Sequence, residues 1–158
     1  MESPFHIVLV EPEIPPNTGN IARLCGATGV TLHLVGRLGF SLDDRSLKRA
    51  GLDYWHAVRI FRWESLEGLC AQYPDARLVL TSTRGGTPYH RFSFAPHDFI
   101  LFGNESRGLP AELLARHPGR TIRIPITGPV RSLNLSTSAG IVLYEALRQT
   151  GHLDGEPG

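Results

Sequence analysis

The stretch Asp98-Phe-Ile-Leu-Phe102 is followed by Gly103-Asn-Glu-Ser-Arg-Gly108 and then by a helix-like segment that starts at Leu109-Pro110. Four apolar residues in a row predict a short strand that is buried on both faces. The glycine-rich segment is typical of a turn, and a proline is well tolerated in the first turn of a helix. A buried strand that leads through a polar loop into a helix is typical of a parallel α/β sheet.

The same alternation of apolar runs and helix-like segments continues on both sides of this stretch. The other expected strands are His6–Val10, Thr31–Val35, Ala57–Phe61, Arg77–Thr81 and Arg120–Ile126. The expected helices are Asn17–Gly29, Asp43–Gly51, Trp63–Tyr73, Leu109–His117 and Leu133–Thr150. This order predicts the α/β class, with a mostly parallel sheet flanked by helices.

The length of 158 residues predicts one domain, which we place at residues 1–150, followed by a flexible tail at residues 151–158. Apolar residues make up 41% and charged residues 20% of the chain, as in ordinary globular domains. The formal net charge is +1, so no strong overall field draws the chain toward nucleic acid. Of the 16 basic residues only Lys48 is not an arginine. Arginine is the better bidentate phosphate ligand, but a codon bias explains the excess equally well.

Several classes of protein are disfavoured. No apolar run approaches the roughly 18 residues that a membrane span needs. The first residues lack the basic and apolar regions of a signal peptide. Cys25 and Cys70 are isolated, which argues against a zinc site or a disulfide framework. We therefore expect a cytoplasmic protein with no metal and no membrane association.

Three late loops share an unusual composition, rich in glycine, serine, threonine and asparagine. They are Thr81–Thr87, Gly103–Gly108 and Pro125–Asn134, and each follows an expected strand. In a parallel sheet these loops emerge at one edge, where ligands bind. Small residues let backbone groups approach a ligand closely, so the loops predict a pocket for a flat polar molecule. Ordinary turn chemistry remains the alternative explanation.

A fourth loop, Glu11–Asn20, leads into the first expected helix. Asn17 is a good helix cap, and Arg23 follows it by six residues. An arginine near a helix start does not complement the helix dipole. This position suggests a role for Arg23 other than local stability, with a salt bridge as the alternative.

Familiar nucleotide-binding and hydrolase signatures are missing from the sequence. It contains no GxGxxG after the first strand, no GxxxxGK[ST] and no GxSxG elbow. These absences weaken the interpretations as a dinucleotide-dependent oxidoreductase, a P-loop nucleotidase or a serine hydrolase.

Three motifs nevertheless resemble those of one family. They are Pro15-Pro-Asn-Thr-Gly-Asn-Ile-Ala-Arg-Leu-Cys25, Phe102-Gly-Asn-Glu-Ser-Arg-Gly-Leu-Pro110, and Ile122-Arg-Ile-Pro-Ile126 with Arg131-Ser-Leu-Asn-Leu-Ser136. In this order they resemble the SPOUT superfamily, and within it the tRNA ribose 2′-O-methyltransferases. The start of the chain and its short length are similar to the branch that modifies the wobble nucleotide and has no added RNA-binding domain. The resemblance covers roughly residues 6 to 150.

The resemblance implies an α/β fold with a C-terminal trefoil knot, which topology rules alone would exclude. It also implies S-adenosyl-L-methionine as the methyl donor, held by the knot loops. The cofactor contacts that it implies are Leu80, Thr81, Gly103, Ile124, Ser132, Leu133 and Asn134.

The implied reaction is methyl transfer to the ribose 2′-OH of the wobble nucleotide, cytidine or a modified uridine, of tRNA. By resemblance Arg23 is the catalytic residue of the first motif, and Asn17 supports it or binds substrate. Because a guanidinium is almost always charged, we expect Arg23 to position a phosphate or the 2′-hydroxyl and to stabilise negative charge. Glu105 is a further candidate around the substrate.

The family acts as homodimers that grip RNA without an accessory domain. The resemblance therefore implies a homodimer that contacts tRNA, with Arg107, Arg131 and Tyr144 as candidate substrate contacts. For each arginine taken singly, a solvated surface charge is the plainer interpretation, and for Tyr144 it is an ordinary core aromatic.

Three alternatives stay open at this point. The first is 2′-O-methylation at another tRNA or rRNA site by the same fold. The second is an RNA-binding relative without catalysis, which a methyl-transfer assay on tRNA distinguishes. The third is an α/β oxidoreductase, which preferential binding of a nicotinamide cofactor would support.

Overall fold

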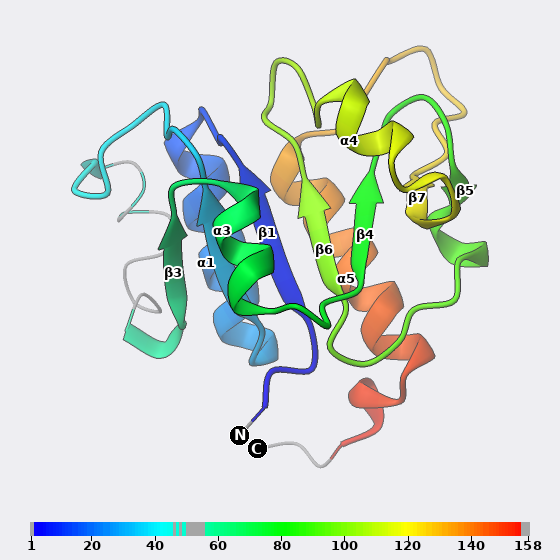
Figure 1. Cartoon of the computed structure of the whole chain (residues 1–158), viewed down its shortest axis with the longest axis horizontal. Helices are drawn as coiled ribbons and strands as arrows, with labels where there is room; N and C mark the ends of the chain where they lie inside the picture. Colours follow the sequence, from blue (N-terminus) through cyan, green and yellow to red (C-terminus); the bar gives the residue numbers. More distant parts are fainter. Residues whose placement is uncertain (1, 46, 48, 50–55, 156–158) are drawn as a thin grey trace.

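The computed structural model describes residues 2–45, 47, 49 and 56–155 (Figure 1). Within them one seven-stranded sheet has the order β3-β2-β1-β6-β4-β7-β5, and all of its paired strands are parallel. The strands are β1 (His6–Val10), β2 (Thr31–Val35), β3 (Ile60–Trp63), β4 (Leu78–Thr81), β5 (Thr87–Pro88), β6 (Phe99–Phe102) and β7 (Thr121–Arg123). The predicted class, a mostly parallel sheet flanked by helices, is confirmed.

Helices cover both faces of the sheet, with α1 and α5 on one face and α3 and α4 on the other (Figure 1). Their bounds are α1 (Pro15–Thr28), α3 (Leu66–Gln72), α4 (Ala111–Ala115) and α5 (Leu135–Gln149). Single turns of 3-10 helix occur at η2 (Tyr89–Arg91), η3 (Pro118–Arg120) and η4 (His152–Asp154). In the described part of the chain, no helix is long and apolar enough to cross a membrane.

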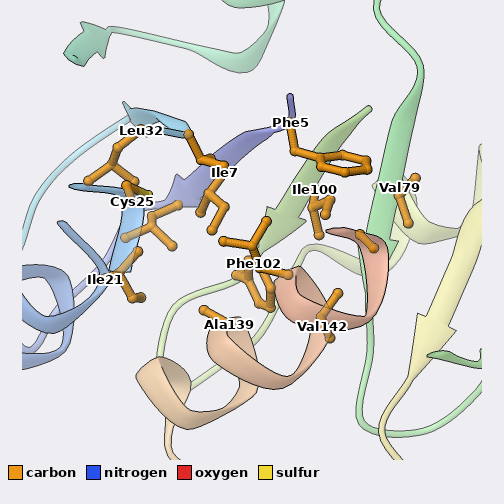
Figure 2. Close-up of a cluster of buried hydrophobic side chains, with 14 of the residues drawn as sticks. Phe5, Ile7, Ile21, Cys25, Leu32, Val79, Ile100, Phe102, Ala139 and Val142 are labelled. Carbon is orange, nitrogen blue, oxygen red and sulfur yellow. The ribbon is translucent and has the colours of Figure 1, made fainter. Parts of the chain in front are cut away.

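The larger hydrophobic core lies between the sheet and the pair α1 and α5. Ile7 and Ile100, from the central strands, meet Ile21 of α1 and Val142 of α5 in this layer (Figure 2). All four side chains are almost completely buried, and burial of each such side chain contributes about 1.5–3 kcal/mol relative to exposure. A smaller core on the opposite face includes Leu69 of α3 and Leu113 of α4.

The predicted strands β1 and β2 have the expected bounds, whereas β3 lies further along the chain than predicted. Residues 56 and 57 are 3-10 helical and residue 58 forms a bend instead, and the strand runs from Ile60 to Trp63. This register places Trp63 beside Val35 of β2 and lets its indole donate a hydrogen bond to His33 at 3.0 Å. These contacts with β2 fix the position of β3.

Other boundaries also differ from the predictions. β7 ends at Arg123 rather than Ile126, and the two-residue strand β5 was not predicted because it is too short for any periodic signal. The predicted helix Asp43–Gly51 falls partly on positions 46, 48, 50 and 51, which lie outside the described residues. The division into a domain at residues 1–150 and a tail at 151–158 stays a prediction.

The parallel arrangement brings the loops of interest to one edge of the sheet. Thr81 at the end of β4 pairs with Ile122 of β7, and Leu80 pairs with Leu101 of β6. The strands therefore deliver the loops after β4, β6 and β7 to the same carboxyl edge, at the top of Figure 1. α1 also starts there, after β1.

Candidate functional site

The first turn of α1 is capped by a side chain that is distant in sequence. Ile14 precedes the helix, and its side chain makes no capping hydrogen bond. Glu105, in the loop after β6, accepts hydrogen bonds from the backbone N–H groups of Glu13 (2.8 Å) and Ile14 (2.9 Å). A carboxylate is stabilised here because the helix dipole is positive at this end. Glu105 therefore couples the start of α1 to the loop at 103–108.

The same two segments are joined a second time, in the opposite direction. The Glu13 carboxylate accepts hydrogen bonds from the backbone N–H of Ser106 (3.0 Å) and from the Ser106 hydroxyl (2.5 Å). These bonds, the hydroxyl first, hold the pKa of Glu13 below its usual value. Glu13 and Glu105 thus form a reciprocal clasp between the loop after β1 and the loop after β6. The partners of Glu13 lie 92 and 93 residues away in the sequence, so local sequence patterns do not reveal this clasp.

Asn17 links this clasp to the start of α5. Its side chain is buried, with 5% of its surface exposed. The Asn17 Nδ2 group donates to Glu105 (3.2 Å), so its Oδ1 faces away and accepts from Asn134 Nδ2 (3.0 Å). Since a carboxylate only accepts, this orientation of the amide is the one that satisfies both partners.

Asn134 completes the chain of contacts by capping α5. Its Oδ1 accepts from the backbone N–H groups of Ser136 (2.8 Å) and Thr137 (3.3 Å). Such a cap is worth about 1 kcal/mol of helix stability. Residues from the first, second and third sequence motifs, Asn17, Glu105 and Asn134, are therefore joined by side-chain hydrogen bonds at the carboxyl edge of the sheet.

The expected cofactor contacts at the strand ends also lie together. Leu80 is fully buried in β4, and the hydroxyl of Thr81 donates to the carbonyl of Leu101 at 2.9 Å. Gly103 directly follows β6, and the other end of its loop packs tightly against it. A Cβ added at Gly103 would lie 2.0 Å from the carbonyl carbon of Gly108. Ile124, just past β7, is partly buried against the main core.

The remaining expected cofactor contacts lie on the segment between β7 and α5. Ser132 and Leu133 are exposed, with 36% of the Leu133 surface accessible. Between residues 126 and 133 no backbone group hydrogen-bonds to the backbone of another described residue outside helices and strands. Backbone groups of this kind are available to a bound ligand. The neutral donors, small residues and exposed apolar side chains of this edge fit a flat ligand such as an adenosine with a zwitterionic tail.

Arg23 lies on a different side of α1 from Asn17. It is exposed on α1, on the same side as the exposed Asn20, whereas Asn17 faces the interior. Because α1 begins at Pro15, Arg23 is the ninth helical residue, beyond the first turn in which the helix dipole acts. The expectation that Arg23 sits unfavourably near the helix start is therefore wrong, as is the expectation that Asn17 is the cap residue.

The candidate substrate contacts are all exposed except Glu105, which is partly buried. Arg107 is 74% exposed, and its guanidinium approaches Glu11 at 4.0 Å. Arg131 is exposed in the segment before α5, and Tyr144 is 44% exposed on α5. In the described residues no cluster of histidine, cysteine and carboxylate side chains has the geometry of a metal site.

Comparison with known proteins connects this geometry to a family. The family described as the SpoU rRNA Methylase family matches residues 4–144. A tRNA (cytidine(34)-2'-O)-methyltransferase of Burkholderia ambifaria is 47% identical over 156 residues, which cover 96% of this chain and 99% of the relative.

Two solved structures of methyltransferases are also similar to this chain. A protein whose structure is described as giving insights into the 2-OH methylation of C/U34 on tRNA has a TM-score of 0.88 and 47% identity, covering 96% of this chain and 97% of that chain. The SpoU methyltransferase AviRb from Streptomyces viridochromogenes, in complex with the cofactor AdoMet, has a TM-score of 0.81 and 26% identity, covering 98% of this chain and 63% of that chain. With the motif residues gathered at one edge and nearly the whole length matched, the chain belongs to the SpoU rRNA methylase family.

Proposed function

We propose that this chain transfers a methyl group from S-adenosylmethionine to the ribose 2′-OH of the wobble nucleotide, position 34, of tRNA. The observation that carries the proposal is the similarity to a tRNA (cytidine(34)-2'-O)-methyltransferase over 96% of this chain. The junction of Asn17, Glu105 and Asn134, one residue from each motif, supports it. The oxidoreductase alternative finds no support in this family.

The carboxyl edge of the sheet fits S-adenosylmethionine as the methyl donor. The contacts would come from Leu80, Thr81, Gly103, Ile124 and the segment Ser132–Asn134, largely through backbone groups. When bound, this cofactor supplies an electrophilic methyl group on a sulfonium. The protein supplies orientation and electrostatic stabilisation rather than new covalent chemistry.

Arg23 is the residue that we assign to the reacting groups of the RNA. Its exposed guanidinium is a bidentate donor for a phosphate or for the oxygen that develops negative charge. Asn17 and Glu105 act differently, because both ends of the Asn17 amide and both oxygens of the Glu105 carboxylate are already hydrogen-bonded within the protein. We assign them as positioning residues that hold α1, the loop at 103–108 and α5 in register.

Three further features belong to the same proposal. The first is a C-terminal trefoil knot, supported by the path of the chain, which runs from β7 beside β4 back to α5 packed on α1. The second is a homodimer, supported by the exposed apolar side chains of Val130, Leu133 and Tyr144 in and before α5. The third is action in the cytoplasm, where tRNA is modified, with Arg107 and Arg131 as RNA contacts.

The test is transfer of a tritiated methyl group from S-adenosylmethionine to tRNA, followed by mapping of the modified nucleotide. We expect label at the 2′-oxygen of position 34 and loss of that modification in cells that lack the protein. Label at another position would replace the wobble assignment by a different RNA site. Binding of tRNA without any transfer would instead favour a non-catalytic RNA-binding relative.

A further inference from the structure

The charged residues are divided unevenly along the chain. Two stretches, residues 76–97 and 113–144, contain seven of the 16 basic residues and none of the 15 acidic residues. The seven are all arginines: Arg77, Arg84, Arg91, Arg116, Arg120, Arg123 and Arg131. The rest of the chain has an excess of acidic residues, so the net charge of +1 is the balance of two parts with opposite charge.

The fold brings the two stretches together at one end of the sheet. β7, from the second stretch, pairs with β4 on one side and with β5 on the other, and both of these strands belong to the first stretch. The three strands form the right side of the sheet in Figure 1, with β5 at its edge. We call β4, β5, β7 and the loops at 82–86 and 124–134 the acid-free end.

The four acidic residues that adjoin the two stretches in the sequence neutralise little of this charge. Asp75 and Asp98 precede β4 and β6, so they lie at the opposite, amino edge of the sheet, where Asp98 pairs with Arg77 at 3.2 Å. Glu145 forms an ion pair within α5, and Glu112 lies in the first turn of α4. The carboxyl edge of the acid-free end therefore keeps an excess of positive charge.

The loop after β4 presents Arg84 from a backbone that is held at both ends. The backbone N–H of Ser82 donates to the carbonyl of Ile122 in β7 at 2.9 Å. The guanidinium of Arg123, also in β7, donates to the carbonyl of Gly86, which has the left-handed φ of +89° that glycine favours. Because the loop is already ordered, a ligand that binds to Arg84 does not have to immobilise its backbone.

Two exposed arginines of the acid-free end are not engaged with the rest of the protein. In the part of the chain that the structure describes, the guanidinium groups of Arg84 and Arg131 make no hydrogen bond or ion pair. Three other arginines face carboxylates within 4.0 Å, namely Arg77, Arg107 and Arg148. Arg84 and Arg131 can therefore bind an anion without first breaking an ion pair, and both lie on loops of the carboxyl-edge site.

We propose that the acid-free end binds phosphates of the tRNA backbone, with Arg84 and Arg131 as the contacts beside the carboxyl-edge site. Guanidinium groups bind phosphate oxygens in a bidentate manner, and a surface of arginines without carboxylates attracts a polyanion. The inference rests on the proposed function, which takes tRNA as the substrate, and it adds Arg84 and the surface on which the RNA lies. Because phosphates carry no sequence information, this surface positions the tRNA rather than selecting it.

Methylation kinetics at two salt concentrations test the proposal. One phosphate contact accounts for an increase of about threefold in the KM for tRNA between about 50 and 200 mM salt. We therefore expect this increase to be about threefold smaller in R84A and about tenfold smaller in R84A/R131A than in the wild type. In R84A, kcat and the KM for S-adenosylmethionine should stay within about twofold of the wild type, and R84K should keep most of the salt dependence.

R37A is the matched control, because Arg37 is also exposed at the carboxyl edge, after β2, but lies beside Glu11 and outside the acid-free end. We expect it to keep the salt dependence of the wild type. An unchanged salt dependence in R84A would overturn the proposal, and so would an equal reduction in R37A and R84A. A higher KM for S-adenosylmethionine in R84A, with an unchanged KM for tRNA, would assign Arg84 to the cofactor instead.

Direct binding of tRNA to the same variants separates this inference from the proposed function. If the wild type binds tRNA with a salt dependence that R84A reduces, but transfers no methyl group, the proposed function fails and the phosphate surface stands. If the wild type methylates tRNA and R84A binds it with the full salt dependence, the phosphate surface fails and the proposed function stands.

Discussion

At the scale of single residues, a network of three side chains joins segments that are far apart in the sequence. Glu105 accepts from two backbone N–H groups and from Asn17, and Asn17 accepts from Asn134. Both oxygens of the Glu105 carboxylate and both ends of the buried Asn17 amide are hydrogen-bonded. Removing one member leaves its partners without hydrogen bonds, which is more damaging than the loss of a typical surface contact.

An exchange of amide and carboxylate between positions 17 and 105 tests this interpretation. In N17D a carboxylate replaces the amide that donates to Glu105 at 3.2 Å, so two negative charges face each other. We expect the free energy of unfolding at pH 7 to fall by about 2–3 kcal/mol. In N17D/E105Q the glutamine donates to the aspartate, and we expect at least a third of the loss to be recovered. Urea unfolding of the four proteins gives the coupling energy, and additive effects would contradict a direct contact.

The role assigned to Arg23 leads to a second prediction. R23A removes a donor to the RNA without touching the loops that we assign to the cofactor, so we expect kcat to fall at least 100-fold. Binding of S-adenosylmethionine, measured by calorimetry, should stay within about twofold of the wild type. A large loss of cofactor affinity would refute the assignment of Arg23 to the RNA. N20A changes another exposed residue on the same side of α1 and is the matched control.

At the scale of elements, the sequence predicted the strands best where they are buried in the middle of the sheet. β1, β2 and β6 are short runs rich in apolar residues, and this local pattern was enough to identify them as strands. β3 was misplaced because the hydrogen bond between Trp63 and His33 joins two strands. The start of α1 was misplaced for a similar reason, since its capping carboxylate comes from Glu105. The parallel-sheet pattern predicted that the late loops gather at one edge, but local patterns do not contain the distant partners that join Asn17, Glu105 and Asn134 there.

The loop after β6 has a sharp steric requirement that a third prediction uses. A methyl group at Gly103 would lie 2.0 Å from the carbonyl carbon of Gly108 and 2.1 Å from the backbone nitrogen of Leu109. Backbone atoms cannot rotate away, so the loop of G103A must shift. We expect a loss of at least about 2 kcal/mol of stability and a fall in affinity for S-adenosylmethionine of at least tenfold. G119A places its methyl group in open space and should behave as the wild type in thermal unfolding and calorimetry.

At the scale of the whole molecule, the two faces of the sheet have different chemistry. The core under α1 and α5 is mainly hydrophobic (Figure 2), whereas the face under α3 includes His33, which is completely buried, and the partly buried His6. Burial lowers the pKa of His33 to about 3 and that of His6 to about 4. For His33 the neighbouring His6 adds to this effect, and for His6 the positive charges of His97 and Arg59 do so.

These histidines make the stability of the whole fold depend on pH, which is the fourth prediction. Their folded-state pKa values lie below the value of about 6.5 in the unfolded chain, so the unfolded state binds more protons between pH 6.5 and about 4. The free energy of unfolding should therefore be constant with respect to these groups above pH 7 and fall as the pH drops below 6.5. The limiting slope is about 1.4 kcal/mol per pH unit for each histidine.

H33Q keeps an acceptor for Trp63 and a donor for His6, and urea unfolding between pH 7.5 and 4.5 should show a shallower decline in this variant. H56Q, at an exposed histidine, should retain the full slope, and an equal slope in H33Q and the wild type would show that the His33–His6 pair is not the source.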